Sequence, residues 1–181
     1  LVWLDPQENR WLNPFVAQAR DYLVALMGEI YDLGFSEILL DKVAFPTNGI
    51  QSIISYGANT DKVGAINAFI TSAKAMAQQK GGQVAAVYNN TAPTETQQYP
   101  GGQDLTSFVS ELYRIYVPVK AGDASVAESM SQTIGAGFAT RFVAVEVNAN
   151  TDISALGPAT ASGNGCMYKS ADGVYPAGLC E

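Results

Sequence analysis

Segments with helical periodicity alternate along this chain with short apolar segments of strand character, and this alternation constrains the fold more than any other feature. Between residues 13 and 33 apolar side chains recur at steps of three and four, which predicts an amphipathic helix with Asn13 as its N-cap and Gly34 at its end. The strand Ser36–Asp41 follows directly. The pattern then predicts a helix at Asp61–Gln79, a strand at Val84–Tyr88, a short helix from Asp104, a strand at Tyr113–Val119, a helix at Ser125–Ile134, a strand at Arg141–Val147 and a last apolar piece at Cys166–Tyr168.

Strands separated by helices predict a parallel sheet, because a parallel crossover needs a connection of helix size. An open doubly wound sheet and a closed barrel both fit this order. The strands favour the barrel, because one of their faces carries polar side chains, whereas central strands of an open sheet are usually apolar on both faces. Polar groups on the inner face, some at the carboxyl ends of strands, are typical of a (β/α) barrel. These polar residues are Glu37 and Asp41, Arg114 and Tyr116, and Glu146 and Asn148.

The composition fits a single domain over residues 1–181 and excludes two classes of partner. The net charge is −7 and the ten Lys and Arg residues are scattered, so we expect neither nucleic acid nor an anionic membrane surface as a partner. No apolar run approaches the roughly 20 residues needed to cross a bilayer, so we expect no membrane insertion. Because Leu1 opens inside an apolar stretch, we expect the N-terminus to be a cut or processed edge, with which a secretion signal could have been lost.

The chain contains no histidine, which removes the commonest general base and the commonest metal ligand. A Ser-His-Asp or Cys-His arrangement therefore cannot be built within it, and we expect neither a metal site nor a cofactor. Cys166 and Cys180 lack the partners of a zinc site. A single disulfide between them would fit an extracytoplasmic protein, and two unpaired buried thiols are the alternative.

Two stretches near the N-terminus resemble a family of glycoside-hydrolase barrels. Trp3-Leu4-Asp5-Pro6 matches the family's W-x-[DN]-P element, and after a helix residues 34–46 (GFSEILLDKVAFP) are similar to its strand motif G-F-D-E-I-x-[FL]-D-Y-[IV]-R-F-P. The likeness spans roughly the first 50 residues. It departs from the family at Lys42 and Ala44, where the motif has Tyr and Arg, so any sugar contact made by those two side chains is changed or lost.

By this resemblance Ser36–Asp41 is the fourth strand of a barrel, the next three strands are the fifth to the seventh, and Cys166–Tyr168 is the eighth. A complete (β/α)₈ barrel has about 250 residues, so the chain would be a partial TIM barrel of about strands 4–8, the C-terminal part of a longer barrel. An N-terminal half in a longer parent, a second copy or another chain would complete it. An open barrel exposes strand edges and apolar surface, which favours association.

Glycoside hydrolysis usually needs two carboxyl groups that flank the scissile bond, one to protonate the leaving oxygen and one to attack the sugar or activate water. Asp41 ends the implied fourth strand and Glu146 lies near the end of the implied seventh, both on the predicted inner face. This placement resembles that of many retaining barrel glycosidases, although their acid on strand four is normally Glu. We therefore expect Asp41 and Glu146 to be the catalytic pair.

Each of these acidic residues also has a purely structural interpretation. Asp41 would then only accept hydrogen bonds from the loop that follows it, and Glu146 would only pair with a Lys or Arg. Glu37 and Arg114, deeper in the barrel, would neutralise each other as a buried ion pair.

Sugar binding draws on aromatic faces and amide side chains, and five residues of these types are candidates for it. A tyrosine in a strand is more often part of the core than a sugar platform, and a tryptophan in the motif could merely cover the barrel rim. The five candidates are Trp3, Tyr88, Asn90, Tyr116 and Asn148.

The leading interpretation is a secreted or cell-surface barrel protein that acts on carbohydrate, by carboxylate-pair hydrolysis if it is catalytic. The second is a barrel that binds glycan or cell-wall polymer without cleaving it. The third is a structural barrel fragment that assembles with a missing half. Loss of turnover in an Asp41→Asn variant that keeps its fold would favour the first.

Overall fold

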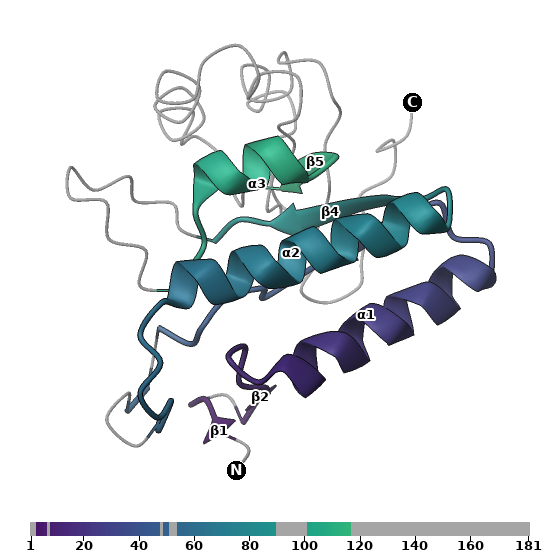
Figure 1. The fold of residues 1–181 in the computed structure, drawn as a ribbon. Coiled ribbons are helices and arrows are strands. Elements are labelled where there is room, and N and C mark those ends of the chain that lie inside the picture. Colours follow the sequence, from purple (N-terminus) through teal and green to yellow (C-terminus); the bar gives the residue numbers. More distant parts are fainter. Residues whose placement is uncertain (1–2, 7, 48, 51–53, 90–100, 117–181) are drawn as a thin grey trace, which may run out of the picture.

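The computed structural model describes residues 3–6, 8–47, 49–50, 54–89 and 101–116, which form an α/β arrangement (Figure 1). The elements predicted beyond residue 116, with both cysteines, lie outside these ranges. No helix within the ranges is long and apolar enough to cross a membrane. In chain order the elements are β1 (Trp3–Leu4), β2 (Arg10–Trp11), α1 (Ala17–Asp32), β3 (Glu37–Leu40), α2 (Lys62–Gln79), β4 (Gln83–Val87), α3 (Leu105–Glu111) and β5 (Arg114–Tyr116).

A three-stranded parallel sheet in the order β3-β4-β5 forms the centre of the described chain. Helix α2 connects β3 to β4, and α3 connects β4 to β5. The strands therefore lie side by side in chain order, without the reversal that marks a doubly wound sheet. In this register Leu40 is opposite Ala86, and Ala86 is opposite Ile115. The predicted parallel α/β sheet is thus confirmed for this part of the chain.

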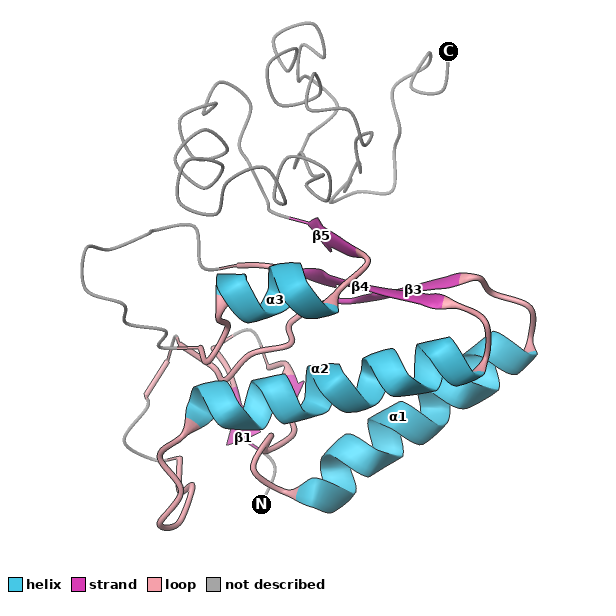
Figure 2. Ribbon diagram, turned by 45° about the horizontal axis from the view of Figure 1, so that its top comes forward, coloured by secondary structure: helices cyan, strands magenta, loops and turns pink. Residues whose placement is uncertain are grey.

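The three helices pack against one face of the sheet. One core cluster joins Met27 of α1, Ile66 of α2 and Phe108 of α3 to the strand residues Val84 and Ile115. Figure 2 shows α1 and α2 together on the same side of the strands. The opposite face carries a second, smaller cluster, formed by Leu39, Ala85, Val87 and Tyr116. Helices on a single face are the arrangement found around a (β/α) barrel, whereas a doubly wound sheet has helices on both faces.

Short polar side chains and a glycine define the helix ends. The side chain of Asp61 caps α2 by accepting a hydrogen bond from the backbone N of Gly64 at 2.8 Å, and Asp104 caps α3. Gly34 follows α1 in the left-handed region at φ 95°, which glycine adopts without a steric penalty. The predicted N-cap of the first helix was wrong. The helix begins at Ala17, and Asn13 instead accepts a hydrogen bond in a preceding turn.

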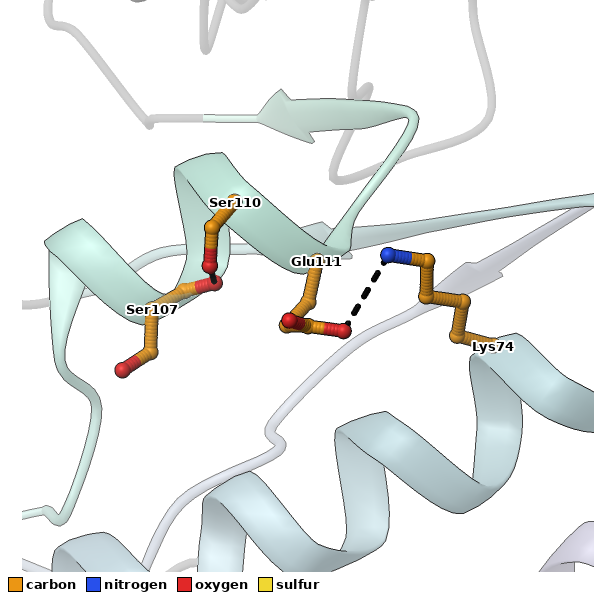
Figure 3. Close-up of polar contacts among 4 residues, drawn as sticks. All are labelled: Lys74, Ser107, Ser110 and Glu111. Atoms are coloured by element: carbon orange, nitrogen blue, oxygen red, sulfur yellow. Dashed lines mark hydrogen bonds and ion pairs between the residues drawn. The ribbon is translucent and has the colours of Figure 1, made fainter.

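Within the described residues two ion pairs join neighbouring helices. Lys74 of α2 lies 3.2 Å from Glu111 of α3 (Figure 3), and Lys80, the C-cap residue of α2, lies 2.6 Å from Asp32 of α1. The side chains of both pairs are partly exposed to solvent. Such pairs contribute at most about 1 kcal/mol each, so the apolar core between sheet and helices provides most of the stability.

Candidate functional site

The carboxyl ends of β3, β4 and β5 lie along one edge of the sheet, because the three strands are parallel. Ligands of parallel sheets bind outside this edge, where the loops that follow the strands meet. Asp41 directly follows β3, Tyr88 follows β4, and Tyr116 is the last residue of β5. This edge is therefore the candidate functional site.

Asp41 lies on a sharp bend directly after β3. Its side chain is exposed, and its Oδ1 accepts a hydrogen bond from the backbone N of Lys42 at 2.8 Å. Lys42 has a left-handed φ of 55°, which is uncommon for a residue with a side chain. The carbonyl of Lys42 accepts from the backbone N of Ala44 at 2.8 Å, which closes the bend. A carboxylate at the end of a strand is thus presented to solvent by a conformation that costs about 1–2 kcal/mol.

Gln103 connects the ends of two strands from a buried position, with 2% of its surface exposed. Its Nε2 donates hydrogen bonds to the carbonyls of Val43 and Val87 at 3.0 Å each, and its Oε1 accepts from the backbone N of Asn89 at 2.9 Å. The sequence did not indicate this role, because a glutamine in a polar loop carries no periodic signal. The side chain holds the loops after β3 and β4 against each other.

Glu37, Arg114 and Tyr116 meet on the sheet face opposite the helices. The predicted ion pair between Glu37 and Arg114 is absent from the described structure. Instead Glu37 accepts a hydrogen bond from the Tyr116 hydroxyl at 3.3 Å, and Arg114 donates to the Tyr113 hydroxyl at 3.4 Å. Burial raises the pKa of Tyr116, and the hydrogen bond to Tyr113 is the first cause of a raised pKa for Arg114. At neutral pH this face therefore presents a neutral phenol beside a guanidinium cation.

Tyr88 lies on the other side of the sheet, among the core residues that face the helices. Its ring is 4% exposed and meets Phe108 of α3 edge to face, with the ring centroids 5.9 Å apart. The structure therefore does not bring the Tyr88 ring together with Tyr116 or Glu37. The segment Ala85-Ala86-Val87-Tyr88 is apolar on both faces, so the sequence did not predict which face of the sheet carries the Tyr88 ring.

The motif at the N-terminus forms a small antiparallel hairpin of β1 and β2. The buried carboxylate of Asp5 organises it. Asp5 accepts hydrogen bonds from the backbone N of Asn9 at 2.9 Å, from Asn9 Nδ2 at 2.9 and 3.1 Å, and from Trp11 Nε1 at 3.1 Å. The W-x-[DN]-P element marked the position of Asp5 in the sequence but did not indicate this role.

Trp3 links the hairpin to the loop that begins at Asp41. Its ring lies against Trp11, with centroids 6.2 Å apart. On the other side it approaches Gly49, where an added Cβ would lie 3.3 Å from Cζ2 of Trp3 and 3.1 Å from Cδ of Pro6. The indole Nε1 of Trp3 is buried and makes no hydrogen bond in the described structure. Trp3 thus packs between the hairpin and the loop that follows β3.

A cavity of about 380 Å³ runs between α1 and β3. Its volume lies within the range of small-molecule pockets. Most of its wall is apolar, with Leu23, Met27 and Ile30 from α1 and Ile38 and Leu40 from β3. The charged side chains that border it are Arg10 of the hairpin, Arg20 of α1, and Asp41 and Lys42, which follow β3.

Three of the predicted site residues, Asn90, Glu146 and Asn148, lie outside the described residues. The pairing of Asp41 with Glu146 therefore stays a prediction. Within the described ranges, no group of three or more Cys, Asp or Glu side chains is placed to hold a metal ion.

The model of a protein family described as "Putative glycosyl hydrolase domain" matches residues 1–118. A search of curated protein sequences found no match.

Several solved structures are similar in fold. The spore cortex-lytic enzyme SleL of Bacillus megaterium QM B1551 is 12% identical with a TM-score of 0.55. The match covers 76% of this chain and 31% of SleL. Catalytic domain 2 of the group II chitinase of Ostrinia furnacalis is 10% identical with a TM-score of 0.53, and 76% of this chain covers 40% of it. A chitinase of Chromobacterium violaceum is 15% identical with a TM-score of 0.54, and 81% of this chain covers 47% of it.

At such low identity the similarity of these solved structures to this chain concerns the fold alone. This chain spans less than half the length of each of them.

Proposed function

The chain belongs to this glycosyl hydrolase domain family, and from that premise we propose that it is a (β/α)-barrel glycoside hydrolase that uses a pair of carboxyl groups. β3, β4 and β5 correspond to the fourth, fifth and sixth strands of the barrel. The parallel order of these strands and the helices on a single face support this assignment.

The position of Asp41 carries the proposal. It is exposed at the carboxyl end of β3, the edge at which barrel enzymes place their catalytic groups. Asp41 is the general acid that protonates the leaving glycosidic oxygen, and Glu146 is the nucleophile or the base that activates water. Trp3 and Tyr116 contribute aromatic surface to the sugar site, with Asn90 and Asn148 as amide donors. The buried ring of Tyr88 takes no part.

Chito-oligosaccharides and isolated cell-wall polymer are the first substrates to test. One of the similar solved structures is a chitinase catalytic domain in complex with a chito-oligosaccharide, and another is a cortex-lytic enzyme. Hydrolysis of such polymers takes place outside the cytoplasm, so we propose an extracellular or cell-surface location.

The experiment compares the wild-type chain with Asp41→Asn and with Asp21→Asn, an exposed carboxylate on α1 that serves as the matched control. We expect Asp41→Asn to lose turnover by about 100-fold or more, because general acid catalysis contributes roughly 10²–10⁴-fold. Asp21→Asn should hydrolyse the substrate like the wild type. Equal turnover in all three would exclude Asp41 as the acid. Glycan binding without turnover in any of them would instead identify a non-catalytic glycan-binding module.

A second candidate function, assembly through the edge of β3, is favoured by the cavity beside that strand. Within the described sheet β3 pairs with β4 on one side only, and the apolar wall between α1 and β3 lies on the other. A closed barrel leaves no strand edge free, so we propose that a second copy pairs with this side of β3 when the chain is studied by itself. Sedimentation analysis of the wild type and of Leu26→Asp, which lines the cavity, tests this. A wild-type monomer at all concentrations would contradict it.

A further inference from the structure

We propose that Gln103 is a positioning residue, which fixes the location of Asp41 through the backbone at the ends of β3 and β4. The proposal rests on the catalytic role proposed for Asp41. Gln103 lies 60 residues from Val43 and 16 residues from Val87 along the chain, yet its amide contacts both.

The three hydrogen bonds of Gln103 use both amide protons and the amide oxygen. A glutamine side chain has two N–H donors and a carbonyl acceptor, and here they meet Val43 O, Val87 O and the backbone N of Asn89. Because the group is buried, each of these bonds forms in surroundings of low dielectric constant and would leave a costly unpaired group if it were broken. One side chain thus connects the backbone that follows β3 to the backbone at the carboxyl end of β4.

Asp41 lies between two fixed points of this network. Before it, Leu40 is paired with Ala86 in the sheet. After it, the carbonyl of Val43 is held by Gln103, and the backbone N of Phe45 donates to the carbonyl of Gly101 at 2.8 Å. Both later ties come from the short segment at residues 101–103.

The bend between these points is held under strain. The left-handed φ of Lys42 is disfavoured, so residues 41–44, between the paired Leu40 and the bonded Phe45, would relax if the hydrogen bond at Val43 were lost. The hydrogen bond from the Lys42 amide to Asp41 Oδ1 would then break, and the carboxylate would move away from the sheet edge.

The test uses Gln103→Met, which keeps the length of the side chain but removes the donors and the acceptor. Tyr31→Phe is the matched control. It removes one buried hydrogen bond, from the Tyr31 hydroxyl to the carbonyl of Gln83 at 2.6 Å, at the opposite end of β4. We expect both variants to lose stability, but only Gln103→Met removes a hydrogen bond from the backbone that follows β3.

The first measurement is hydrogen exchange at the Lys42 amide. We expect exchange at least about 10-fold faster than wild type in Gln103→Met and unchanged in Tyr31→Phe, since only the former releases the bend. The second measurement is glycan hydrolysis, in which kcat of Gln103→Met should fall about 100-fold with little change in KM, as expected when a catalytic group is displaced by about 1 Å. Equal Lys42 exchange in both variants, or normal kcat in Gln103→Met, would overturn the proposal.

The two measurements separate this inference from the proposed function. If the wild type hydrolyses no glycan, the catalytic proposal fails, while exchange at Lys42 still decides whether Gln103 orders Asp41. If Gln103→Met does not fold, Gln103→Glu gives the same comparison. It keeps an acceptor for Asn89 but cannot donate to both carbonyls, so the same faster exchange is expected.

Discussion

Replacing Asp5 should open the hairpin at the edge of the candidate site while leaving the sheet and helices folded. The Asp5 carboxylate accepts from three N–H groups, the backbone and side chain of Asn9 and the indole of Trp11. Hydrogen bonds to a charged group contribute about 1.5–3 kcal/mol each, but Asn9 is exposed and its donors can return to water. We therefore expect Asp5→Ala to destabilise the hairpin by about 3 kcal/mol, which raises its opening equilibrium roughly 100-fold.

Intrinsic tryptophan fluorescence isolates this local event, because the chain has two tryptophans and both, Trp3 and Trp11, lie in the hairpin. Far-ultraviolet circular dichroism instead reports mainly on the helices. In a urea titration the two signals of the wild type should change together. In Asp5→Ala the fluorescence transition should come at lower urea than the dichroism transition, because the hairpin opens as a separate unit.

Asp5→Asn and Arg10→Ala complete the comparison. The amide keeps one acceptor oxygen but turns an N–H₂ toward the other donors, so we expect a loss of about 1 kcal/mol for Asp5→Asn. Arg10 is an exposed residue of the same hairpin, and its replacement should leave both transitions coincident. Coincident transitions in Asp5→Ala as well would refute the view that this carboxylate organises the hairpin.

Two further predictions concern the amino end of β4. Burial, and then Glu37, raise the pKa of Tyr31 above 10.0, so the stability that it contributes is present below about pH 10 and is lost as the pH rises through the folded-state pKa. Tyr31→Phe should lower the free energy of unfolding at neutral pH by about 1 kcal/mol, measured by urea titration. It should also reduce the loss of stability above pH 10. If stability falls above pH 10 as steeply as in the wild type, Tyr31 is not the group responsible. Gly82→Ala should cost about 2 kcal/mol in thermal unfolding, because its Cβ would lie 2.7 Å from Cδ1 of Tyr31. Gly34 has a left-handed φ but open space around an added Cβ, so Gly34→Ala should cost only about 1 kcal/mol. Equal losses of stability in the two variants would argue against a clash between the Cβ of residue 82 and Tyr31.

Local patterns in the sequence were sufficient to predict the helices of the described chain and the three strands of its parallel sheet. Helix α2 begins after the cap Asp61 and ends before Gly81, close to the predicted bounds, because side-chain periodicity and capping act over a few residues. The parallel pairing of β3, β4 and β5 followed from the helices between them. Asp41 was placed at the end of its strand by the same local reasoning.

Other features depended on contacts that no local pattern encodes. The hairpin escaped prediction because two-residue strands are too short to show an alternation, and because the side chain of Asp5 supplements its few backbone hydrogen bonds. The predicted pairing of Glu37 with Arg114 was replaced by separate bonds to tyrosine hydroxyls, because the register of the sheet sets which side chains meet.

For the described chain the sequence by itself thus determined the helices, the three strands of the central sheet with their parallel direction, and the aspartate at the end of β3. The tertiary structure decided that the side chain of Tyr88 packs in the core with the helices. It also decided that Gln103 connects the backbone at the carboxyl ends of β3 and β4. The physical reason is the range of the interactions. Periodicity, caps and turns depend on neighbours within a few residues, whereas the orientation of an apolar strand and the partners of a buried amide are settled only when distant segments pack together.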